Sequence, residues 1–348
     1  MHEGIKNFLF SLLDYSGAPE LALALRKQDE SFIVLYHGVA PDLPNYGIYN
    51  YRRKFILPEN FQTHLSWFQS HFEIVPLSTL IERFLRGLKL PRRYLAITFD
   101  DGYANVYHYA FPVLKKFGVP ATVFITTDLV EKRSPLWVDR LEYALGYTRQ
   151  QKLEVEFGEH RRSFRLGTRQ ERIATDAYLR NYLKKISDSE RRNALDKIES
   201  LCSVALAPTL ETSPYRGLTW EQIRIMTEHK IEFAPHTMSH PILTRMPPQK
   251  AEEEIIESYR LLDKRVGNPL PIFAYPNGQR EDFSDETAAI LRRHGFRAAL
   301  TTIPGTVDRA SNPFALPRFS LDGSDDLRFL RLTISGVRKK MQDIRSLF

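Results

Sequence analysis

Cysteine is almost absent from this chain of 348 residues, which contains Cys202 alone. An intrachain disulfide is therefore impossible, and the small disulfide-stapled scaffolds of secreted proteins are excluded. Long apolar runs are also lacking, since none approaches the ~18 residues that a membrane-spanning helix requires. With 43% hydrophobic and 26% charged residues, the composition is typical of a globular protein that folds around its own core.

The first residues lack the features of a cleavable signal peptide. The apolar stretch at 8–13 is short, Asp14 ends it, and no small-residue cleavage site follows. We therefore expect a cytoplasmic location. Apolar residues recur through 5–13 at the spacing of one helix face, which predicts an amphipathic helix. This face could pack on the body of the protein, or it could make a peripheral contact with a membrane surface.

A large excess of one charge sign is absent as well. The formal net charge is +7, and the basic residues are spread along the chain. Such a balance favours anionic partners such as phospholipid headgroups or nucleotide-sugar diphosphates. No nucleic-acid-binding motif is present, so nucleic acid is not expected as a partner.

Short apolar runs alternate with helical patterns along most of the chain. The runs that predict buried strands lie near residues 32–37, 73–76, 94–99, 121–126, 231–235, 271–275, 297–301 and 314–319. This alternation predicts an α/β protein with a parallel sheet covered by helices, and seven or eight such units favour a barrel. In a barrel the chemistry lies at the C-terminal ends of the strands.

One charged and helix-rich segment, 139–215, interrupts this alternation. Its first part alternates apolar and polar residues on both sides of Gly158, which predicts a β-hairpin followed by two helices. We interpret the segment as an insertion over the barrel mouth. We expect an N-terminal helical segment at 1–30 and a barrel in two parts, at 31–138 and 216–322. The insertion lies between these parts at 139–215, and a C-terminal helix follows at 323–348.

Two motifs that end predicted strands carry most of the chemical information. Asp100 and Asp101 follow one apolar run, and His236 and His240 follow another. A catalytic zinc-type site needs three protein ligands and an open position. Asp101, His236 and His240 could supply those ligands, and Asp100 could act as general base towards water. Zn²⁺ is the expected metal, with Co²⁺ or Ni²⁺ as alternatives.

Each motif is weak evidence when taken alone. An Asp-Asp-Gly sequence at a strand end is often only a turn, and two histidines four residues apart also occur by chance. The helical zinc motif His-Glu-x-x-His is absent, because Thr237 stands in the place of the glutamate. The metal site is favoured because both motifs end apolar strands in a chain that alternates like a barrel.

Four motifs in this order resemble those of the polysaccharide deacetylases, the NodB-homology or carbohydrate esterase 4 family. They lie at residues 35–39, 98–102, 236–241 and 273–278. The resemblance implies a deformed (β/α)₇ TIM-like barrel, here with a helix and hairpin insertion. It also implies a metal-dependent hydrolase that removes N-acetyl groups from an N-acetylhexosamine in a glycan or glycan precursor.

The resemblance also gives roles to matched positions. Asp100 would be the catalytic base, and Asp101, His236 and His240 would be the metal ligands. In the third motif, the backbone N–H of Tyr275 would help to hold the oxyanion, and Asn277 of the same motif would join it in substrate binding.

The sequence departs from the family pattern at two places. The third motif usually carries an arginine that orients the base, whereas 272–274 contains none. Arg318 could substitute for it, or it could be a surface arginine or one that faces a phosphate of the substrate. The late histidine that acts as general acid is missing too. His37 ends the first strand and is proposed as the acid or as a hydrogen-bond partner of the site, with a core histidine as the alternative.

The substrate and the chemistry stay open at this point. An aromatic group, Tyr46, Tyr49 and Tyr51, precedes a basic run at 52–54, which could stack on sugar rings and bind a diphosphate, or could merely anchor a loop. The expected partners are an acetylated sugar, an oligosaccharide, or a lipid- or nucleotide-linked precursor of a surface polysaccharide. O-acetyl ester cleavage and a degenerate barrel that binds glycans without turnover are the alternatives.

Overall fold

A computed structural model defines the fold of the chain. It describes residues 10–25, 29–43, 47–90, 93–157, 160–204, 213–321 and 327–338, to which the statements below refer. The amphipathic helix predicted at 5–13 lies largely outside these ranges, although 10–15 are helical, and Tyr46 lies outside as well. No helix within the described ranges is long and apolar enough to cross a bilayer.

Six parallel strands form the central sheet, in the order β12-β1-β5-β6-β9, with β4 paired to the start of β5. Their bounds are β1 Phe32–Tyr36, β4 Glu73–Ile74, β5 Tyr94–Phe99, β6 Ala121–Ile125, β9 Ile231–Pro235 and β12 Phe319–Ser320. Every residue of β1 and β6 is buried. Such continuous apolar runs are typical of parallel strands that are covered on both faces.

A second parallel pair, β10 (Ile272–Ala274) and β11 (Ala298–Leu300), continues the wall beyond β9. The N–H of Leu270 donates to the carbonyl oxygen of Phe233 at 2.8 Å, which ties the entry of β10 to β9. The strands β1, β5, β6, β9, β10, β11 and β12 thus build the predicted deformed (β/α)₇ barrel. The barrel is not closed, because the pair β10-β11 and the central sheet do not share one continuous ladder.

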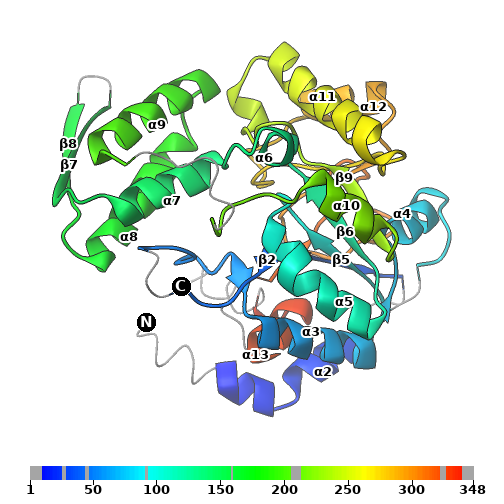
Figure 1. Ribbon diagram of the computed structural model, residues 1–348. Coiled ribbons are helices and arrows are strands. Elements are labelled where there is room, and N and C mark those ends of the chain that lie inside the picture. Colours follow the sequence, from blue (N-terminus) through cyan, green and yellow to red (C-terminus); the bar gives the residue numbers. More distant parts are fainter. Residues whose placement is uncertain are drawn as a thin grey trace.

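Helices cover the outside of this wall (Figure 1). In α3, Phe61, Leu65 and Phe68 lie on one helix face and enter the same core cluster as Val34 of β1. The helical segments that flank the strands are α3 Pro58–His71, α4 Leu77–Leu85, η1 Val106–Ala110, α5 Phe111–Phe117, α6 Thr127–Glu131, α10 Trp220–Thr227, η2 Leu243–Arg245, α11 Pro248–Val266 and α12 Asp285–Arg293. Short strands β2 (Gly38–Val39) and β3 (Phe55–Ile56) pair beside the end of β1.

Residues 137–202 form a helical lobe beside the barrel, drawn in green at the left of Figure 1. Its elements are α7 Trp137–Tyr147, the antiparallel pair β7 Lys152–Phe157 and β8 His160–Arg165, α8 Arg169–Leu183 and α9 Asp188–Cys202. Capping boxes begin α8 at Thr168 and α9 at Ser187, which satisfies N–H groups at both helix starts. The lobe has its own apolar core, which includes Leu141, Leu179 and Cys202.

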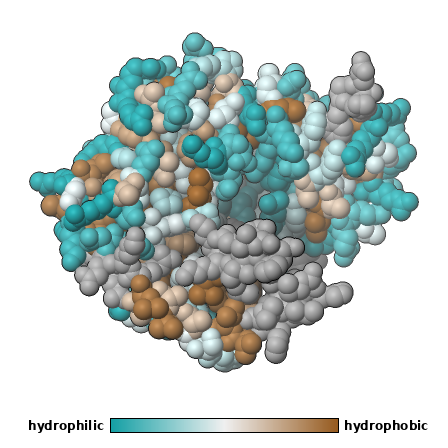
Figure 2. All heavy atoms as spheres, turned by 180° about the vertical axis from the view of Figure 1, so that it is seen from behind, coloured by the Kyte–Doolittle hydropathy of each residue, from teal (hydrophilic) through white to brown (hydrophobic). Residues whose placement is uncertain are grey.

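Helices from the two ends of the chain lie together at the bottom of Figure 1, namely α2 (Ala18–Ala24) and α13 (Leu327–Ile334). Arg331 of α13 pairs with Asp14 at 3.0 Å and with Glu20. Large apolar residues are exposed in this region, Leu12, Tyr15, Leu21 and Leu25. Figure 2, which shows the molecule from behind, has hydrophobic residues along its lower edge. The predicted membrane contact stays a prediction.

Candidate metal centre and catalytic pocket

Asp101, His236 and His240 converge at the C-terminal ends of β5 and β9. Nε2 of His236 lies 3.4 Å and Nε2 of His240 lies 3.3 Å from Oδ1 of Asp101. One ligand atom from each residue lies within 4.8 Å of the other two, and all three side chains are buried. The structure therefore brings the three predicted ligands to one point.

The donor set fits a divalent metal ion. Oδ1 of Asp101 is buried and has no hydrogen-bond partner among the described residues, although two imidazole nitrogens face it. Two neutral imidazoles and one carboxylate are ligands that Zn²⁺, Co²⁺ and Ni²⁺ all accept. A cation between these atoms would compensate the buried carboxylate charge.

The backbone at this site adopts conformations that side chains rarely tolerate. Asp101, Thr237, His240 and Asn277 have φ values of 74°, 67°, 59° and 59°. Gly102 also has a positive φ of 86°, and a Cβ there would lie 2.8 Å from Cδ1 of Ile125. Such strained positions cluster at functional sites, where the surrounding structure holds them in place.

Supporting hydrogen bonds fix the histidine loop. Nδ1 of His236 lies 2.7 Å from the carbonyl oxygen of Ala274, so a proton on Nδ1 leaves Nε2 free to bind metal. Glu254 of α11 accepts hydrogen bonds from the N–H groups of Met238 at 2.8 Å and Ser239 at 2.9 Å, and from the Ser239 hydroxyl at 2.6 Å. Glu254 could not be identified from the sequence, because it resembles its neighbours on a charged helix.

Arg318 holds both carboxylate oxygens of Asp100. Its Nη1 donates to Oδ1 and its Nη2 donates to Oδ2, each at 2.7 Å. Its Nε donates to the carbonyl oxygen of Thr301 at 2.8 Å, and the side chain is fully buried. Arg318 is therefore neither a surface arginine nor one that faces a substrate phosphate. It lies behind Asp100 and outside the pocket lining, so its predicted contact with substrate is wrong.

The electrostatics keep both aspartates ionised. Burial raises the pKa of Asp100, but the Arg318 and His236 charges outweigh it, so the net shift is downward. Burial likewise opposes ionisation of Asp101, yet the adjacent histidines, His240 first, hold its pKa well below the usual range. Opposite charge at short range favours the charged form of a carboxylate. The pocket thus contains a carboxylate suited to a cation and a second one suited to accept a proton.

A pocket of about 340 Å³ joins the barrel to the helical lobe. The predicted site residues that line it are His37, Asp100, Asp101, His236, His240 and Asn277. The lobe contributes three further lining residues, Glu142, Arg180 and Lys184. Its volume lies within the range of roughly 300–1,000 Å³ that small-molecule sites occupy.

Tyr275 does not take its predicted role. Its N–H donates to the carbonyl oxygen of Leu300 at 3.1 Å, and its hydroxyl donates to that of Phe314 at 3.1 Å. The predicted oxyanion contact is therefore wrong, because the β10-β11 wall already uses this N–H. Asn277, two residues on, lines the pocket instead, and its buried Nδ2 has no partner in the described part of the chain.

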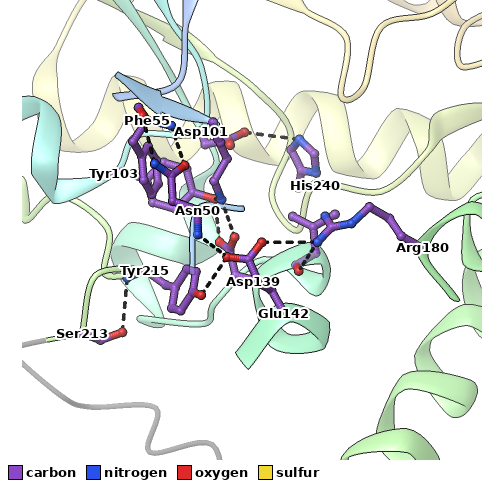
Figure 3. A network of polar contacts seen from close by, with 12 residues as sticks. Asn50, Phe55, Asp101, Tyr103, Asp139, Glu142, Arg180, Ser213, Tyr215 and His240 are labelled. Atoms are coloured by element: carbon purple, nitrogen blue, oxygen red, sulfur yellow. Dashed lines mark hydrogen bonds and ion pairs between the residues drawn. The ribbon is translucent and has the colours of Figure 1, made fainter. Parts of the chain in front are cut away.

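A buried polar network fastens the lobe to the loop that follows β5 (Figure 3). Asp139 accepts hydrogen bonds from the Tyr103 hydroxyl at 2.6 Å and from Lys54. Glu142 accepts from the Asn50 N–H and from the Tyr215 hydroxyl, both at 2.9 Å. Tyr103 lies two positions after Asp101, so the lobe is coupled directly to the metal loop.

Tyr49 and Tyr51, in the loop before β3, anchor this same contact. Tyr49 is buried and packs against Phe55 and Tyr215. The Tyr51 hydroxyl donates to Asp176 of α8. For Tyr49 and Tyr51, these contacts favour the loop-anchor interpretation over sugar stacking.

Comparison with known proteins agrees with this geometry. Residues 87–299 match the family model described as polysaccharide deacetylase, which is more than half of the chain. The chain therefore belongs to the polysaccharide deacetylase family. Members of this family are hydrolases, and they include enzymes that act on carbon–nitrogen bonds.

Individual relatives are distant. The chain is 21% identical over 261 residues to a putative polysaccharide deacetylase, YxkH, of Bacillus subtilis (strain 168), covering 75% of this chain and 63% of the relative. It is 33% identical over 122 residues to a poly-beta-1,6-N-acetyl-D-glucosamine N-deacetylase of Staphylococcus epidermidis, covering 33% of this chain and 39% of the relative. The chain thus spans less than two thirds of either relative.

Two solved structures share the fold. The Streptococcus pyogenes deacetylase PplD, in complex with acetate, has a TM-score of 0.58 at 17% identity, covering 88% of this chain and 99% of the other. IcaB from Ammonifex degensii has a TM-score of 0.55 at 18% identity, covering 88% and 96%. At these identities the likeness supports the barrel architecture alone.

Proposed function

We propose that this protein is a metal-dependent N-deacetylase that releases acetate from an N-acetylhexosamine residue of a glycan or glycan precursor. The observation that carries the proposal is the position of Asp100. Arg318 holds both of its oxygens, and the next residue, Asp101, faces His236 and His240. An ionised base beside a three-ligand cation site is an arrangement suited to amide hydrolysis by water.

In the proposed reaction Asp100 accepts a proton from the water that attacks the acetyl carbonyl carbon. Arg318 keeps the carboxylate ionised and fixes its orientation. A divalent cation held by Asp101, His236 and His240, most simply Zn²⁺, supplies Lewis acidity at this position when it is bound.

Two further residues complete the proposal. Asn277 lines the pocket, and its Nδ2, which has no partner among the described residues, is suited to donate a hydrogen bond to the carbonyl oxygen as negative charge develops there. His37 lines the same pocket and is the proposed proton donor to the leaving amine.

The substrate proposal rests on the family and on its relatives. The family name and the Staphylococcus epidermidis relative favour an N-acetylated polysaccharide. We extend this to a precursor or product of exopolysaccharide synthesis, with lipid- or nucleotide-linked forms included. The expected cytoplasmic location remains a prediction.

The proposed catalysis is favoured over a degenerate glycan-binding barrel. One ground for degeneracy was the arginine missing from the third motif. Arg318, directly before β12, makes the bidentate contact to Asp100 instead. The missing arginine is therefore no longer an argument for a degenerate site. O-acetyl esterase activity would use the same residues, and comparison of acetate release from N- and O-acetylated sugars would distinguish the two.

Replacement of the base tests the proposal. A positioned general base contributes roughly 10²–10⁴-fold to a rate, so Asp100→Asn should lower acetate release at least about 100-fold while the chain keeps its metal. Asp285→Asn, an exposed change in the first turn of α12, serves as the matched control. Acetate is measured enzymatically with zinc-loaded protein and N-acetylglucosamine oligomers. Wild-type turnover in Asp100→Asn would overturn the assignment.

A further inference from the structure

We propose that the lobe side of the catalytic pocket binds an anionic group, a phosphate or a carboxylate, carried by the glycan substrate. Lys184, which directly follows α8, and Arg52, in the loop before β3, are the contacts that the geometry assigns. The inference rests on the proposed function and narrows it, because it names a negatively charged N-acetylated sugar as the substrate class.

Cationic side chains gather in one part of the pocket lining. Arg52 and Lys54 come from the loop before β3, and Arg180 and Lys184 come from the lobe. None of the four belongs to the motifs that build the metal centre. The lobe and the loop before β3 together therefore place four cationic side chains in a pocket whose other side carries the reacting groups.

Two of the four cations already have carboxylate partners. Lys54 pairs with Asp139, which also accepts the Tyr103 hydroxyl. Arg180 donates to Asp176 from Nε at 2.9 Å and from Nη2 at 3.1 Å. The Lys54–Asp139 pair joins the β3 loop to the lobe, and the Arg180–Asp176 pair lies within α8, so the charge of both cations is largely compensated within the protein.

Lys184 and Arg52 form no ion pair with any carboxylate in the described ranges of the chain. Lys184 is half-buried, and burial lowers its pKa. Arg180 and Arg52 also lower that pKa, whereas Asp282, which has the largest charge effect on it, and Glu281 raise it, so that burial decides the net downward shift. A cation that is withdrawn from water beside other cations is destabilised, and a bound anion would relieve this cost.

The acidic residues of the pocket do not supply the missing compensation. Asp100 is held by Arg318, and Asp101 faces the two imidazoles. Glu142 accepts hydrogen bonds from Asn50 and Tyr215 and lies 3.6 Å from Arg180. The charge that remains on the lobe side is therefore positive, which attracts an anionic ligand and selects against a neutral one.

The experiment compares three substrates with the zinc-loaded full chain. The neutral substrate is an N-acetylglucosamine tetrasaccharide, the phosphate arm is UDP-N-acetylglucosamine, and the carboxylate arm is a hyaluronan tetrasaccharide. Acetate release gives kcat and KM, and calorimetry gives Kd independently of turnover. Lys184→Gln and Arg52→Gln are compared with their exposed neighbours, Lys185→Gln and Arg53→Gln, which do not line the pocket.

We expect the wild-type chain to bind at least one anionic substrate more tightly than the neutral one. Charge-assisted hydrogen bonds of this kind change an equilibrium by about tenfold or more. Lys184→Gln and Arg52→Gln should therefore lower the ratio of anionic to neutral affinity about tenfold, chiefly through KM or Kd, whereas the neighbouring controls keep it. The arm that loses affinity identifies the anion as phosphate or carboxylate.

Two results separate this inference from the function on which it rests. Deacetylation of the neutral oligomer, with an affinity ratio equal in Lys184→Gln and Lys185→Gln, would overturn the anion site and leave the deacetylase intact. Binding of UDP-N-acetylglucosamine or hyaluronan that depends on Lys184, without acetate release from any substrate, would support the anion site and overturn the proposed function.

Discussion

Arg318 reaches Asp100 across 218 positions of sequence. The third motif, where the family arginine is expected, offers Ala274 at a strand end, and that carbonyl oxygen serves His236 instead. The charge that orients the base therefore comes from the residue that directly precedes β12. The exchange is possible because the long, fully buried Arg318 side chain runs past Thr98 of β5, to whose hydroxyl Nη1 donates at 3.2 Å, and meets Asp100 at the end of that strand.

Substitution of Arg318 should affect both stability and activity. Arg318→Met leaves the buried Asp100 carboxylate without its partner, which should lower the free energy of unfolding by about 3–5 kcal/mol. Arg318→Lys keeps a charge but loses the planar two-point contact, so we expect a milder loss of stability and a clear loss of acetate release. Urea unfolding and acetate assays measure the two effects.

The exposed Arg297→Met is the control for these variants. An Arg318→Met protein with wild-type stability and turnover would show that the bidentate contact has no role in the site.

At the level of single residues, the positions of the reactive groups could be predicted from the sequence better than the contacts that surround them. Asp100, Asp101, His236 and His240 follow apolar strands, so their convergence could be expected from the fold. The role of Glu254 could not be expected, because it depends on the packing of α11 against the histidine loop. The oxyanion prediction for Tyr275 was wrong because strand pairing with β11 decides where its N–H points.

The helical lobe combines an independent core with a charged contact surface. Leu141, Leu179 and Leu195 pack inside it, while Asp139 and Glu142 of α7 turn towards the barrel and are 1% and 4% exposed. The alternation of Leu153, Val155 and Phe157 predicts the hairpin that β7 and β8 form. The buried acids could not be predicted, because charged residues on a helix usually face solvent.

The rate at which Cys202 reacts with a thiol reagent measures how often this lobe opens, because the residue lies in the lobe's apolar core. Cys202 is 1% exposed, and burial raises its pKa to about 11. At pH 8 the thiol is therefore mostly protonated as well as shielded, and a disulfide reagent should label the native wild-type chain slowly compared with the unfolded chain.

Removal of the Asp139 carboxylate should speed this labelling. Asp139→Ala leaves Lys54 and the Tyr103 hydroxyl without their shared acceptor. Loss of a buried charge partner costs about 3 kcal/mol, which corresponds to roughly 100-fold faster labelling if opening limits the reaction. Asp196→Ala, an exposed change on α9, is the control. Equal labelling rates in the two variants would mean that Asp139 does not hold the lobe.

At the scale of the whole molecule, the catalytic pocket lies between the barrel and the helical lobe. The barrel supplies the metal triad, Asp100 and Asn277, and the lobe and the loop before β3 supply the cationic side chains. Figure 2 shows a hollow near the centre of the view, with mostly hydrophilic residues above it. The barrel could be predicted from periodicity alone, because parallel strands that are buried on both faces give continuous apolar runs. The gap in the strand ladder between β9 and β10 could not be predicted, because the distance between these two strands depends on the packing of the whole barrel.

Metal stoichiometry tests the central claim most directly. The full chain is loaded with zinc, dialysed, and measured by inductively coupled plasma mass spectrometry. We expect about one zinc per chain in the wild type and in Asp100→Asn, and less than about a tenth of that in Asp101→Asn, His236→Gln and His240→Gln, because three-ligand sites lose most of their affinity with one ligand. A wild-type chain without bound zinc, or a His240→Gln chain that binds it as fully as the wild type, would contradict the account.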